Sequence, residues 1–357
     1  MMRILLTGST GFVGRAVTRQ LRQGGHELCH VIRQGSAGRI CAPDPRDRIV
    51  EVEDLFAQPA DWWAETARGY DLVLHMAWYA EPGKYQTSLK NLHCVAGTMA
   101  LAEGARQAGV PRFVGLGTCL EYDLSSGQAF QDTPLAPESP YAAAKAACAT
   151  ALQAALPQAG ISFLWARLFY LHGAEEDPRR LVASLHAHLA KGRPLELSSG
   201  TQIRDFMDVD AAAALLVQDA LSARSGISNI CSGTGISVRA LAESIADQYG
   251  RRDLLIFGAR PGNPDDPPCV IGQRSDAGVA RQVTGQRKAG PDLGELGRDL
   301  VACLAPTGGH VYAGSGRNKA ARNHQADAAR AAGHEGGLSL DREQVGHGFL
   351  LRRGPGA

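Results

Sequence analysis

The sequence has no surplus of charge of either sign and no long apolar run. Its 357 residues carry 37 Lys and Arg against 36 Asp and Glu, a formal net charge of +1. This balance gives no electrostatic reason to expect binding to nucleic acid or to an anionic membrane surface. No apolar run approaches the roughly 18 residues of a membrane-spanning helix, and the N-terminus lacks the pattern of a signal peptide. We therefore expect a cytoplasmic protein without nucleic-acid or membrane partners.

The sequence also lacks paired cysteines. Its eight cysteines are scattered, with no C-x-x-C pair, which argues against a disulfide framework or a zinc site and favours a reducing cytosol. The histidines after residue 306 are widely spaced, so we expect no metal site there or elsewhere.

What the sequence does contain is a regular alternation of apolar runs and helical patterns. Strands are expected at residues 4–6, 27–32, 48–52, 71–76, 112–116 and 162–168. Helices are expected between them, at residues 12–21, 59–66, 86–108 and 141–156. Such alternation predicts an α/β fold, a Rossmann-like doubly wound parallel sheet with helices on both faces.

After residue 168 the pattern of predicted strands and helices changes. We expect helices at 179–190, 210–221 and 237–249, short strands at 194–197 and 254–257, and a turn after Ile230. Residues 1–168 are therefore predicted to form the dinucleotide-binding domain. Residues 169–305 are predicted to form a smaller α/β substrate-binding domain, partly interleaved with the first. No period is evident in residues 306–357, which we expect to be disordered.

A glycine-rich turn, Thr7-Gly-Ser-Thr-Gly-Phe-Val-Gly14, joins the first strand to the first helix. Such a turn places a pyrophosphate on a helix N-terminus, where N–H groups and the helix dipole attract negative charge. Gly8 would permit the tight turn, Gly11 the approach of backbone to phosphate, and Gly14 close packing of helix on strand. The spacing is G-x-x-G-x-x-G, not the common G-x-G-x-x-G, and a simple chain turn is the alternative interpretation.

The second strand ends at Arg33, and no acidic residue lies between His30 and Ser36. In a doubly wound sheet this position lies beside the adenosine ribose, where a carboxylate favours NAD and an arginine favours the 2′-phosphate of NADP. The sequence therefore predicts that NADP(H) is preferred and leaves NAD(H) open. A solvated loop arginine is the alternative. Asp54, after the third strand, is expected to face the adenine edge.

Tyr141 and Lys145 stand four residues apart at the start of an expected helix, so they share one helix face. A cation one turn away favours the phenolate and lowers the pKa of a tyrosine, which otherwise lies near 10. Such a tyrosine exchanges a proton with an alcohol or carbonyl oxygen. Thr118 ends the fifth strand, where ligands of such sheets bind. Y-x-x-x-K is common by chance, but the three residues together predict a catalytic site.

These features resemble the extended short-chain dehydrogenase/reductase family, whose members act on nucleotide sugars as epimerases, dehydratases and ketoreductases. The resemblance covers about residues 2–268. Besides the glycine turn it includes Asp54-Leu55, His75-Met76-Ala77, Asn91 with Gly97-Thr98, Thr118 with Tyr122, Pro137-x-x-Pro140-Tyr141-x-x-x-Lys145, Arg167-Leu168-Phe169-Tyr170-x-x-Gly173 and Arg204-Asp205-Phe206-x-x-Val209-Asp210.

The resemblance implies a catalytic triad of Thr118, Tyr141 and Lys145, with Lys145 also holding the nicotinamide ribose. It implies cofactor contacts from Gly8, Thr10, Gly11, Phe12, Val13, Gly14, Arg33, Asp54, Leu55, Ala77, Asn91, Tyr141, Lys145 and Tyr170. The substrate would meet Trp78 and Thr118, and its diphosphate would be clamped by Arg204 and Arg260. A surface ion pair with Asp205 or Asp208 is the alternative for Arg204. The family also implies a homodimer through the helices at 86–108 and 141–156.

The chain departs from the family pattern after Gly117. Members usually carry Ser-Ser-x-x-Val-Tyr-Gly where this chain has Gly117-Thr-Cys-Leu-Glu-Tyr-Asp123. Glu121 and Asp123 are expected to shape the sugar pocket or lie on its rim. Cys119 is expected to be a small packed side chain and not a nucleophile. Tyr170-Leu-His-Gly173 replaces the usual Asn-x-Tyr-Gly, which leaves open how the nicotinamide end is lined.

The function that this implies is an NADP(H)-dependent reductase of a nucleotide-linked 4-keto-6-deoxysugar, with hydride passing to C4 and Tyr141 as general acid. An NAD-dependent nucleotide-sugar 4-epimerase is the alternative. A non-catalytic NAD(P)-sensing protein is a distant one. A 4,6-dehydratase is disfavoured because Cys119 and Leu120 stand where those enzymes commonly carry an Asp-Glu pair.

Overall fold

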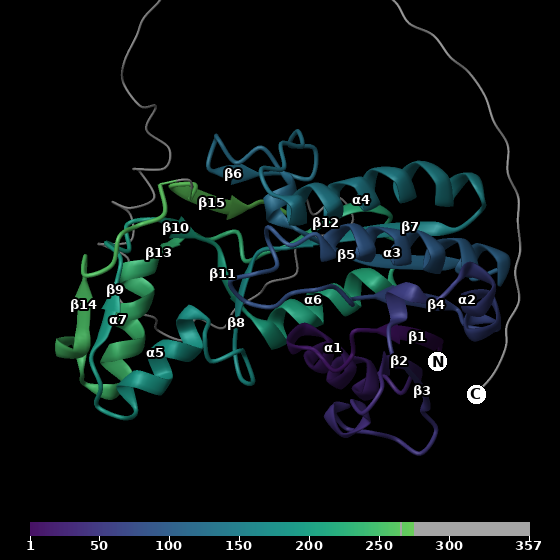
Figure 1. Ribbon diagram of the computed structural model, residues 1–357, viewed down its shortest axis with the longest axis horizontal. Helices are drawn as coiled ribbons and strands as arrows, with labels where there is room; N and C mark the ends of the chain where they lie inside the picture. The colour runs from purple at the N-terminus through teal and green to yellow at the C-terminus, as the bar shows by residue number, and fades with distance from the viewer. Residues whose placement is uncertain (265, 275–357) are drawn as a thin grey trace, which may run out of the picture. The chain divides into compact units, whose positions relative to one another are not determined.

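The computed structural model describes residues 1–264 and 266–274. At its centre lies a seven-stranded parallel sheet with the strand order β12-β7-β5-β4-β1-β2-β3 (Figure 1). These strands are β1 (Arg3–Thr7), β2 (Glu27–Arg33), β3 (Arg48–Val52), β4 (Leu72–His75), β5 (Arg112–Thr118), β7 (Ser162–Leu168) and β12 (Gly226–Ile230). The order reverses beside β1, as in doubly wound dinucleotide-binding sheets. The predicted fold class is confirmed.

Side chains of the sheet alternate between two helical layers, which is the period-2 pattern of a strand buried on both faces. Ile4 and Leu6 pack with α1 (Phe12–Gln23) and α6 (Val209–Leu221). Leu5 points to the opposite face, against α2 (Ala60–Ala67), α3 (Lys90–Gln107) and α4 (Pro140–Gln158). The glycine turn between β1 and α1 is thereby fixed to a rigid core.

The start of α4 is built as its sequence predicts. The Ser139 hydroxyl accepts a hydrogen bond from the Ala142 N–H at 3.2 Å, and Pro140 occupies the first helical turn. Serine satisfies an otherwise unpaired N–H, and proline loses nothing where no helical partner exists. The cap therefore sets where Tyr141 and Lys145 begin their turn of helix.

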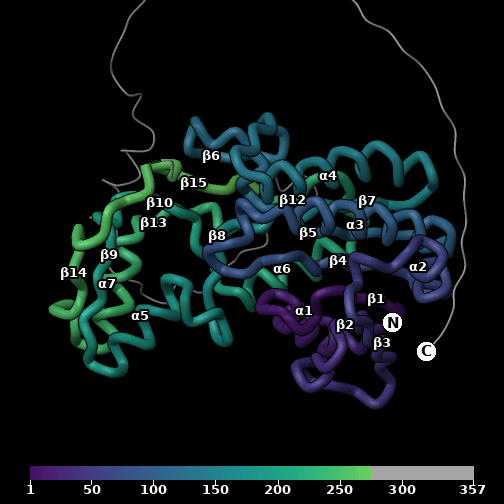
Figure 2. The backbone as a smooth tube through the Cα atoms, in the orientation of Figure 1, coloured from purple at the N-terminus to yellow at the C-terminus, as the bar shows by residue number. Residues whose placement is uncertain are grey.

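The second half of the chain builds smaller sheets and a separate apolar cluster, which lies at the left in Figure 2. That cluster contains α5 (Leu181–Leu189), α7 (Val238–Tyr249), β9 (Leu195–Leu197) and β14 (Leu255–Phe257). A four-stranded sheet joins β13 (Ile236–Ser237), β10 (Ile203–Arg204), β15 (Cys269–Gly272) and β6 (Gln128–Ala129), and β8 (Tyr170–His172) pairs with β11 (Phe206–Asp208).

The largest difference from the sequence prediction is β12. The sequence predicts only a turn after Ile230 and no element for residues 226–229, yet residues 226–230 add a seventh strand beside β7. Only Ile230 of its last three residues is strongly apolar, since the others are the buried Ser228 and Asn229. The remaining unpredicted strands hold two to four residues, too few to show a period. The short helices η1 (Ala37–Arg39), η2 (Leu55–Ala57), η3 (Cys119–Glu121) and η4 (Arg252–Leu254) were also unpredicted.

The chain order is interleaved, because α6 and β12 return from the second half to the main sheet. The boundary at residue 168 stays a prediction, and the predicted disorder of residues 306–357 lies outside the described residues. Among the helices described, none is long and apolar enough to cross a membrane. Cys29, Cys41, Cys94, Cys119, Cys148 and Cys231 are free thiols in the described part of the chain.

Candidate active site

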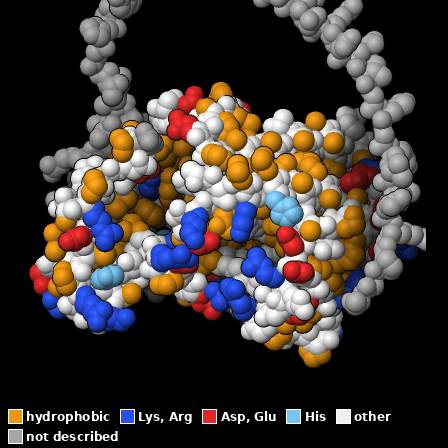
Figure 3. Space-filling model, viewed as in Figure 1, with side chains coloured by type: hydrophobic (Ala, Val, Ile, Leu, Met, Phe, Trp, Pro, Cys, Tyr) orange, Lys and Arg blue, Asp and Glu red, His pale blue; other side chains and the backbone are white. Residues whose placement is uncertain are grey.

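A cleft of about 1510 Å³ opens at the carboxyl ends of the central strands and continues toward the smaller cluster. Figure 3 shows Lys and Arg side chains around the hollow on this face. Most of the predicted site residues line it: Gly8, Thr10, Gly11, Phe12, Val13, Gly14, Arg33, Asp54, Leu55, Ala77, Trp78, Thr118, Tyr141, Lys145, Tyr170 and Arg204. The structure thus brings residues from nearly 200 positions apart into one cavity.

The glycine turn has the geometry that a dinucleotide diphosphate requires. Gly8 has φ +75°, and a Cβ there would lie 2.6 Å from the Ala77 nitrogen. A Cβ on Gly14 would lie 2.1 Å from the Gly8 oxygen, so only glycine lets α1 sit this close. Gly11 caps α1 without a side-chain bond, and the first turn contains no acid. The N–H groups and positive dipole end of α1 therefore suit an anion, and the residues present fit a nicotinamide dinucleotide.

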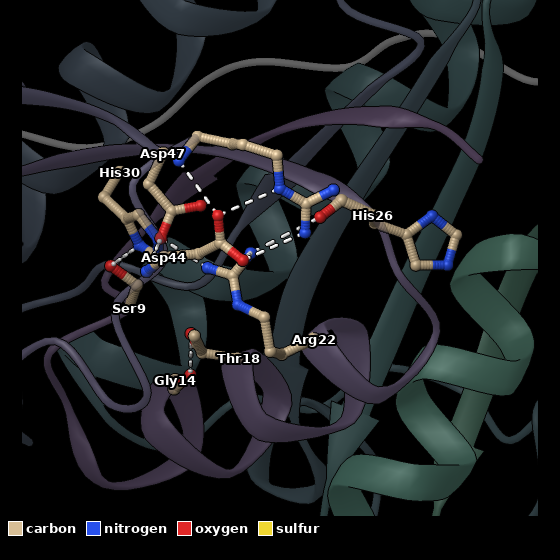
Figure 4. A network of polar contacts seen from close by, with 9 residues as sticks. Ser9, Gly14, Thr18, Arg22, His26, His30, Asp44 and Asp47 are labelled. Atoms are coloured by element: carbon tan, nitrogen blue, oxygen red, sulfur yellow. Dashed lines mark hydrogen bonds and ion pairs between the residues drawn. The ribbon is translucent and has the colours of Figure 1, made fainter.

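A buried polar network braces this turn from behind (Figure 4). The Ser9 hydroxyl lies 2.9 Å from Nδ1 of His30, whose Nε2 lies 3.6 Å from Asp47. Asp47 is in turn paired with Arg22 of α1. Burial lowers the pKa of His30, which keeps the imidazole neutral at pH 7. The turn, β2 and the loop before β3 are therefore held together without a side chain entering the cleft.

At the expected ribose end, Arg33 is exposed on the cleft wall at the end of β2. Ser36 and Arg39, which the sequence analysis missed, line the same wall. Asp54 accepts a hydrogen bond from the Phe56 N–H at 2.9 Å and pairs with His93 at 2.7 Å. Two guanidinium groups and a hydroxyl at this end suit a phosphate. The sequence did contain a signal for a phosphate site here, because Arg33 and Arg39 flank a Gly-Ser segment.

The predicted catalytic residues come together at the middle of the cleft. Thr118 ends β5, Tyr141 lies in the first turn of α4, and Lys145 lies one turn later. Tyr141 and Thr118 share a side-chain hydrogen bond. The Lys145 ammonium donates to the Leu116 carbonyl at 2.6 Å and lies 3.8 Å from the centre of the Trp78 ring. This arrangement aligns two hydroxyls and one ammonium beside the cavity.

Burial dominates the protonation of this pair. It lowers the pKa of Lys145 to about 8 and raises the pKa of Tyr141 above its usual value near 10. The hydrogen bond with Thr118 opposes the rise at Tyr141, whereas the neighbouring Tyr85 and Glu121 add to it. The pKa of Tyr141 therefore lies above its usual value and not below it, as the spacing from Lys145 predicted, because burial is the largest effect on this phenol. Tyr141 is therefore a protonated phenol at neutral pH.

Asn91 lies outside the cleft, although it was predicted to contact the cofactor. It is buried; its Oδ1 accepts from Trp78 Nε1 at 2.8 Å, and its Nδ2 donates to the carbonyls of Tyr85 and Ser88 at 2.7 and 2.9 Å. These three hydrogen bonds use both the oxygen and the nitrogen of the Asn91 amide. Asn91 therefore influences the cavity through the Trp78 indole, which lies on the cavity wall. Trp78, predicted to meet substrate, lies against Lys145 as well as on the cavity wall.

The predicted diphosphate clamp has one arginine in the cleft and not two. Arg204 is buried, with a side chain 3% exposed, and pairs with Asp266 at 2.6 Å. Neither Asp205 nor Asp208 is its partner, so the surface-pair alternative fails. The Arg204 guanidinium also lies 5.3 Å from the ring centre of Tyr170. Arg260 is 63% exposed beside Glu196 and does not line the cleft.

Other residues near the substrate end were missed by the sequence analysis. Tyr79, Tyr85, Arg179 and Arg180 all line the cleft, and the ring of Tyr85 meets that of Tyr141 edge to face at 4.8 Å. The Arg-Arg pair just before α5 was the available signal, since two adjacent cations at a helix start are unfavourable without an anionic partner.

The structure also shows where the residues that depart from the family pattern after Gly117 lie. Glu121 and Asp123 do not line the cleft; Glu121 is fully buried and pairs with Arg167 at 2.7 Å. Burial raises the pKa of the Cys119 thiol to about 12, in agreement with a packed, unreactive side chain. In the part of the chain that is described, no group of three or more His, Cys, Asp or Glu side chains could hold a metal ion.

Comparison with known proteins agrees with this geometry. The chain is 24% identical to a dTDP-6-deoxy-L-talose 4-dehydrogenase (NAD(+)) of Aggregatibacter actinomycetemcomitans, over 76% of this chain and 100% of that protein. It is 29% identical to a UDP-glucose 4-epimerase of Streptomyces lividans, over 82% of this chain and 93% of that protein. The fold superimposes on the dTDP-glucose 4,6-dehydratase DesIV of Streptomyces venezuelae, solved with NAD and TYD bound, with a TM-score of 0.68 and 25% identity over 79% and 93% of the two chains.

A family-level match covers most of the described chain. Residues 4–231 match the family described as NAD dependent epimerase/dehydratase. This stretch contains the glycine turn, the Thr118, Tyr141 and Lys145 constellation and the basic end of β10. The resemblance seen in the sequence is confirmed, and the chain belongs to the NAD dependent epimerase/dehydratase family.

Proposed function

We propose that this protein is an NADP(H)-dependent reductase of a nucleotide-linked 4-keto-6-deoxysugar. The observation that carries the proposal is the convergence of Thr118, Tyr141 and Lys145 in one cleft bordered by cations, where burial also holds the pKa of Tyr141 above its usual value. A protonated tyrosine is suited to donate to a carbonyl oxygen, which is what ketone reduction requires. The same site would need the phenolate to start from an alcohol.

Each of these residues would have a distinct role in the proposed reduction. The hydroxyls of Thr118 and Tyr141 hold the C4 carbonyl oxygen and polarise the bond. As that oxygen gains negative charge, Tyr141 transfers its proton to it and gives the alcohol. The Lys145 ammonium offsets the charge left on the phenolate, which bulk water then reprotonates. A bound dihydronicotinamide supplies the hydride. Arg204 would hold the substrate diphosphate once Asp266 gives way.

The relatives support the coarser part of this assignment and leave two related activities to weigh. A 4-dehydrogenase of a 6-deoxy sugar carries out the same exchange at C4 in the oxidising direction, and a 4-epimerase is the second candidate. Cys119 and Leu120 follow Thr118 without a carboxylate, which disfavours elimination of water. A purely cofactor-sensing role would have no use for Thr118, Tyr141 and Lys145 gathered in one cleft.

The proposal is tested by incubating the purified full chain with NADPH and a series of dTDP- and UDP-linked sugars. We expect loss of NADPH absorbance only with a 4-keto-6-deoxy sugar and formation of the 4-hydroxy product by mass spectrometry and NMR. Interconversion of 4-hydroxy epimers without net consumption of NADPH would instead identify the epimerase.

The preference for NADP is tested at Arg33. Replacing Arg33 with Ser is expected to weaken NADPH binding about 10- to 100-fold, because a charge-assisted bond to the 2′-phosphate is worth about 1.5–3 kcal/mol. NADH binding should stay within about twofold. Fluorescence titration of both dinucleotides measures this, with the exposed Arg68→Ser as the control outside the cleft. Tighter binding of NADH than NADPH by the unaltered protein would refute the preference.

We further propose a cytoplasmic homodimer formed through α3 and α4. Leu89 and Leu92, at the start of α3, are 79% and 67% exposed, and exposed leucines at neighbouring positions favour a protein contact. A cytoplasmic location is where a reductase would meet both NADPH and nucleotide sugars.

A further inference from the structure

The carboxylate of Glu121 lies directly behind the catalytic residues, fully shielded from solvent. It accepts from the Thr118 N–H at 2.8 Å, from Trp165 Nε1 at 3.0 and 3.2 Å, and from Arg167 Nε at 2.7 Å. Three donors from β5 and β7 therefore fix both oxygens. A carboxylate buried this completely is costly unless it is paired, so its position is tightly determined.

This carboxylate determines how Thr118 is presented to the cleft. Glu121 accepts from the Thr118 N–H while the Thr118 hydroxyl accepts from the Leu120 N–H at 3.3 Å, the two halves of a capping box. The reciprocal bonds lock both the backbone and the side chain of Thr118. A Cβ on Gly117 would lie 2.4 Å from Glu121 Oε1, so this close approach also depends on a glycine.

The charge of Glu121 acts on the other two catalytic residues. It raises the pKa of Tyr141 and also that of Lys145, where it opposes the effect of burial. The other groups that raise the pKa of Lys145 are the thiols of Cys148 and Cys94. Burial raises the pKa of both thiols, that of Cys148 to about 12, so they carry no charge at pH 7. Glu121 is thus the carboxylate, among the groups acting on Lys145, that favours its ammonium form.

We propose that Glu121 is a positioning residue of this site, whose carboxylate holds Thr118 in its reactive orientation and favours the ammonium form of Lys145. The proposal rests on the proposed reductase function. Glu121 is also the residue that departs from the family pattern after Thr118. It supplies a buried negative charge behind Thr118, Tyr141 and Lys145.

Two variants separate the two roles. Glu121→Asp keeps the charge but withdraws the oxygen from the Thr118 N–H. Glu121→Gln keeps an acceptor for Thr118 and removes the negative charge, while Arg167 stays in place so that no second charge changes. Asp219→Asn is the matched control, because Asp219 is also buried and paired with an arginine, Arg274, at 2.7 Å, away from the cleft.

The charge role is read without any sugar, from the pH titration of the Lys145 ε-carbon by NMR of ¹³C-lysine-labelled protein, assigned with Lys145→Met. We expect the midpoint near pH 8 in the unaltered protein, in Glu121→Asp and in the control. In Glu121→Gln it should fall by about one pH unit, since removing a negative charge favours the neutral amine. An unchanged midpoint in Glu121→Gln would overturn the charge role.

The orienting role is read from turnover. In Glu121→Asp we expect kcat to fall about 10- to 100-fold, with KM and the NADPH dissociation constant within about threefold, because the loss falls on the transition state. A wild-type kcat in Glu121→Asp would overturn this role. If the unaltered protein reduces no sugar, the reductase proposal fails, yet the Lys145 titration still decides whether Glu121 sets its charge.

Discussion

Replacing Tyr141 with Phe is expected to lower kcat about 10²- to 10⁴-fold, which is the usual contribution of a positioned general acid. In the proposed reductase the phenol supplies the proton for the C4 oxygen, and Thr118 interacts with that phenol. The ring of Tyr141 would remain packed edge to face on Tyr85, so the fold and the cofactor-binding turn are left in place. NADPH binding should therefore change by less than about twofold.

The measurement is steady-state NADPH oxidation together with fluorescence titration of the cofactor. Tyr249→Phe, on the surface of α7, removes the same hydroxyl far from the cleft and serves as the control. Turnover of Tyr141→Phe at the rate of the unaltered protein would remove Tyr141 as the acid, whichever sugar is used.

Replacing Gly14 with Ala is expected to weaken binding of both NADPH and NADH about 100-fold or more, equivalent to about 2.7 kcal/mol. The added Cβ would lie 2.1 Å from the Gly8 oxygen and 2.7 Å from the Ser9 Cα. Both atoms belong to the backbone of the turn, so α1 must move away from it. The N–H groups that would hold the diphosphate then lose their position, and overpacking lowers the free energy of unfolding by about 1–3 kcal/mol.

The loss of cofactor binding is separated from the loss of stability by following thermal unfolding alongside the titrations. Gly38→Ala is the control, because a Cβ at Gly38 meets no atom within 4 Å and its φ is not positive. Full NADPH affinity in Gly14→Ala would show that the turn does not hold the diphosphate as proposed.

Most of the central sheet could be predicted from the sequence because its signals are local. Ile4, Leu5 and Leu6 form an apolar run that has to be buried on both faces, and the glycines that follow allow a turn that other residues would block. Ser139 and Pro140 set the start of α4. The spacing of Tyr141 and Lys145 then places both on one helix face, whatever surrounds them.

Strand β12 could not be predicted from local sequence signals. Ser228 and Asn229 are buried and polar, because Ser228 donates to Asp219 and Asn229 accepts from Tyr122. A strand stabilised by partners about ten to a hundred residues away has no apolar run of its own. Its place beside β7 follows from the packed structure and could not be obtained from its own five residues.

The sequence by itself determined six of the seven strands of the central sheet, the glycine turn and the spacing of Tyr141 and Lys145, and these features carried the resemblance to the family. Only the tertiary structure decided the protonation of Tyr141 and Lys145, because burial is a property of the assembled core and outweighs the effect of their spacing. It also separated Arg204 in the cleft from Arg260 outside it, and placed Glu121 beneath Thr118. These outcomes depend on desolvation and on contacts between distant segments, which no local pattern encodes.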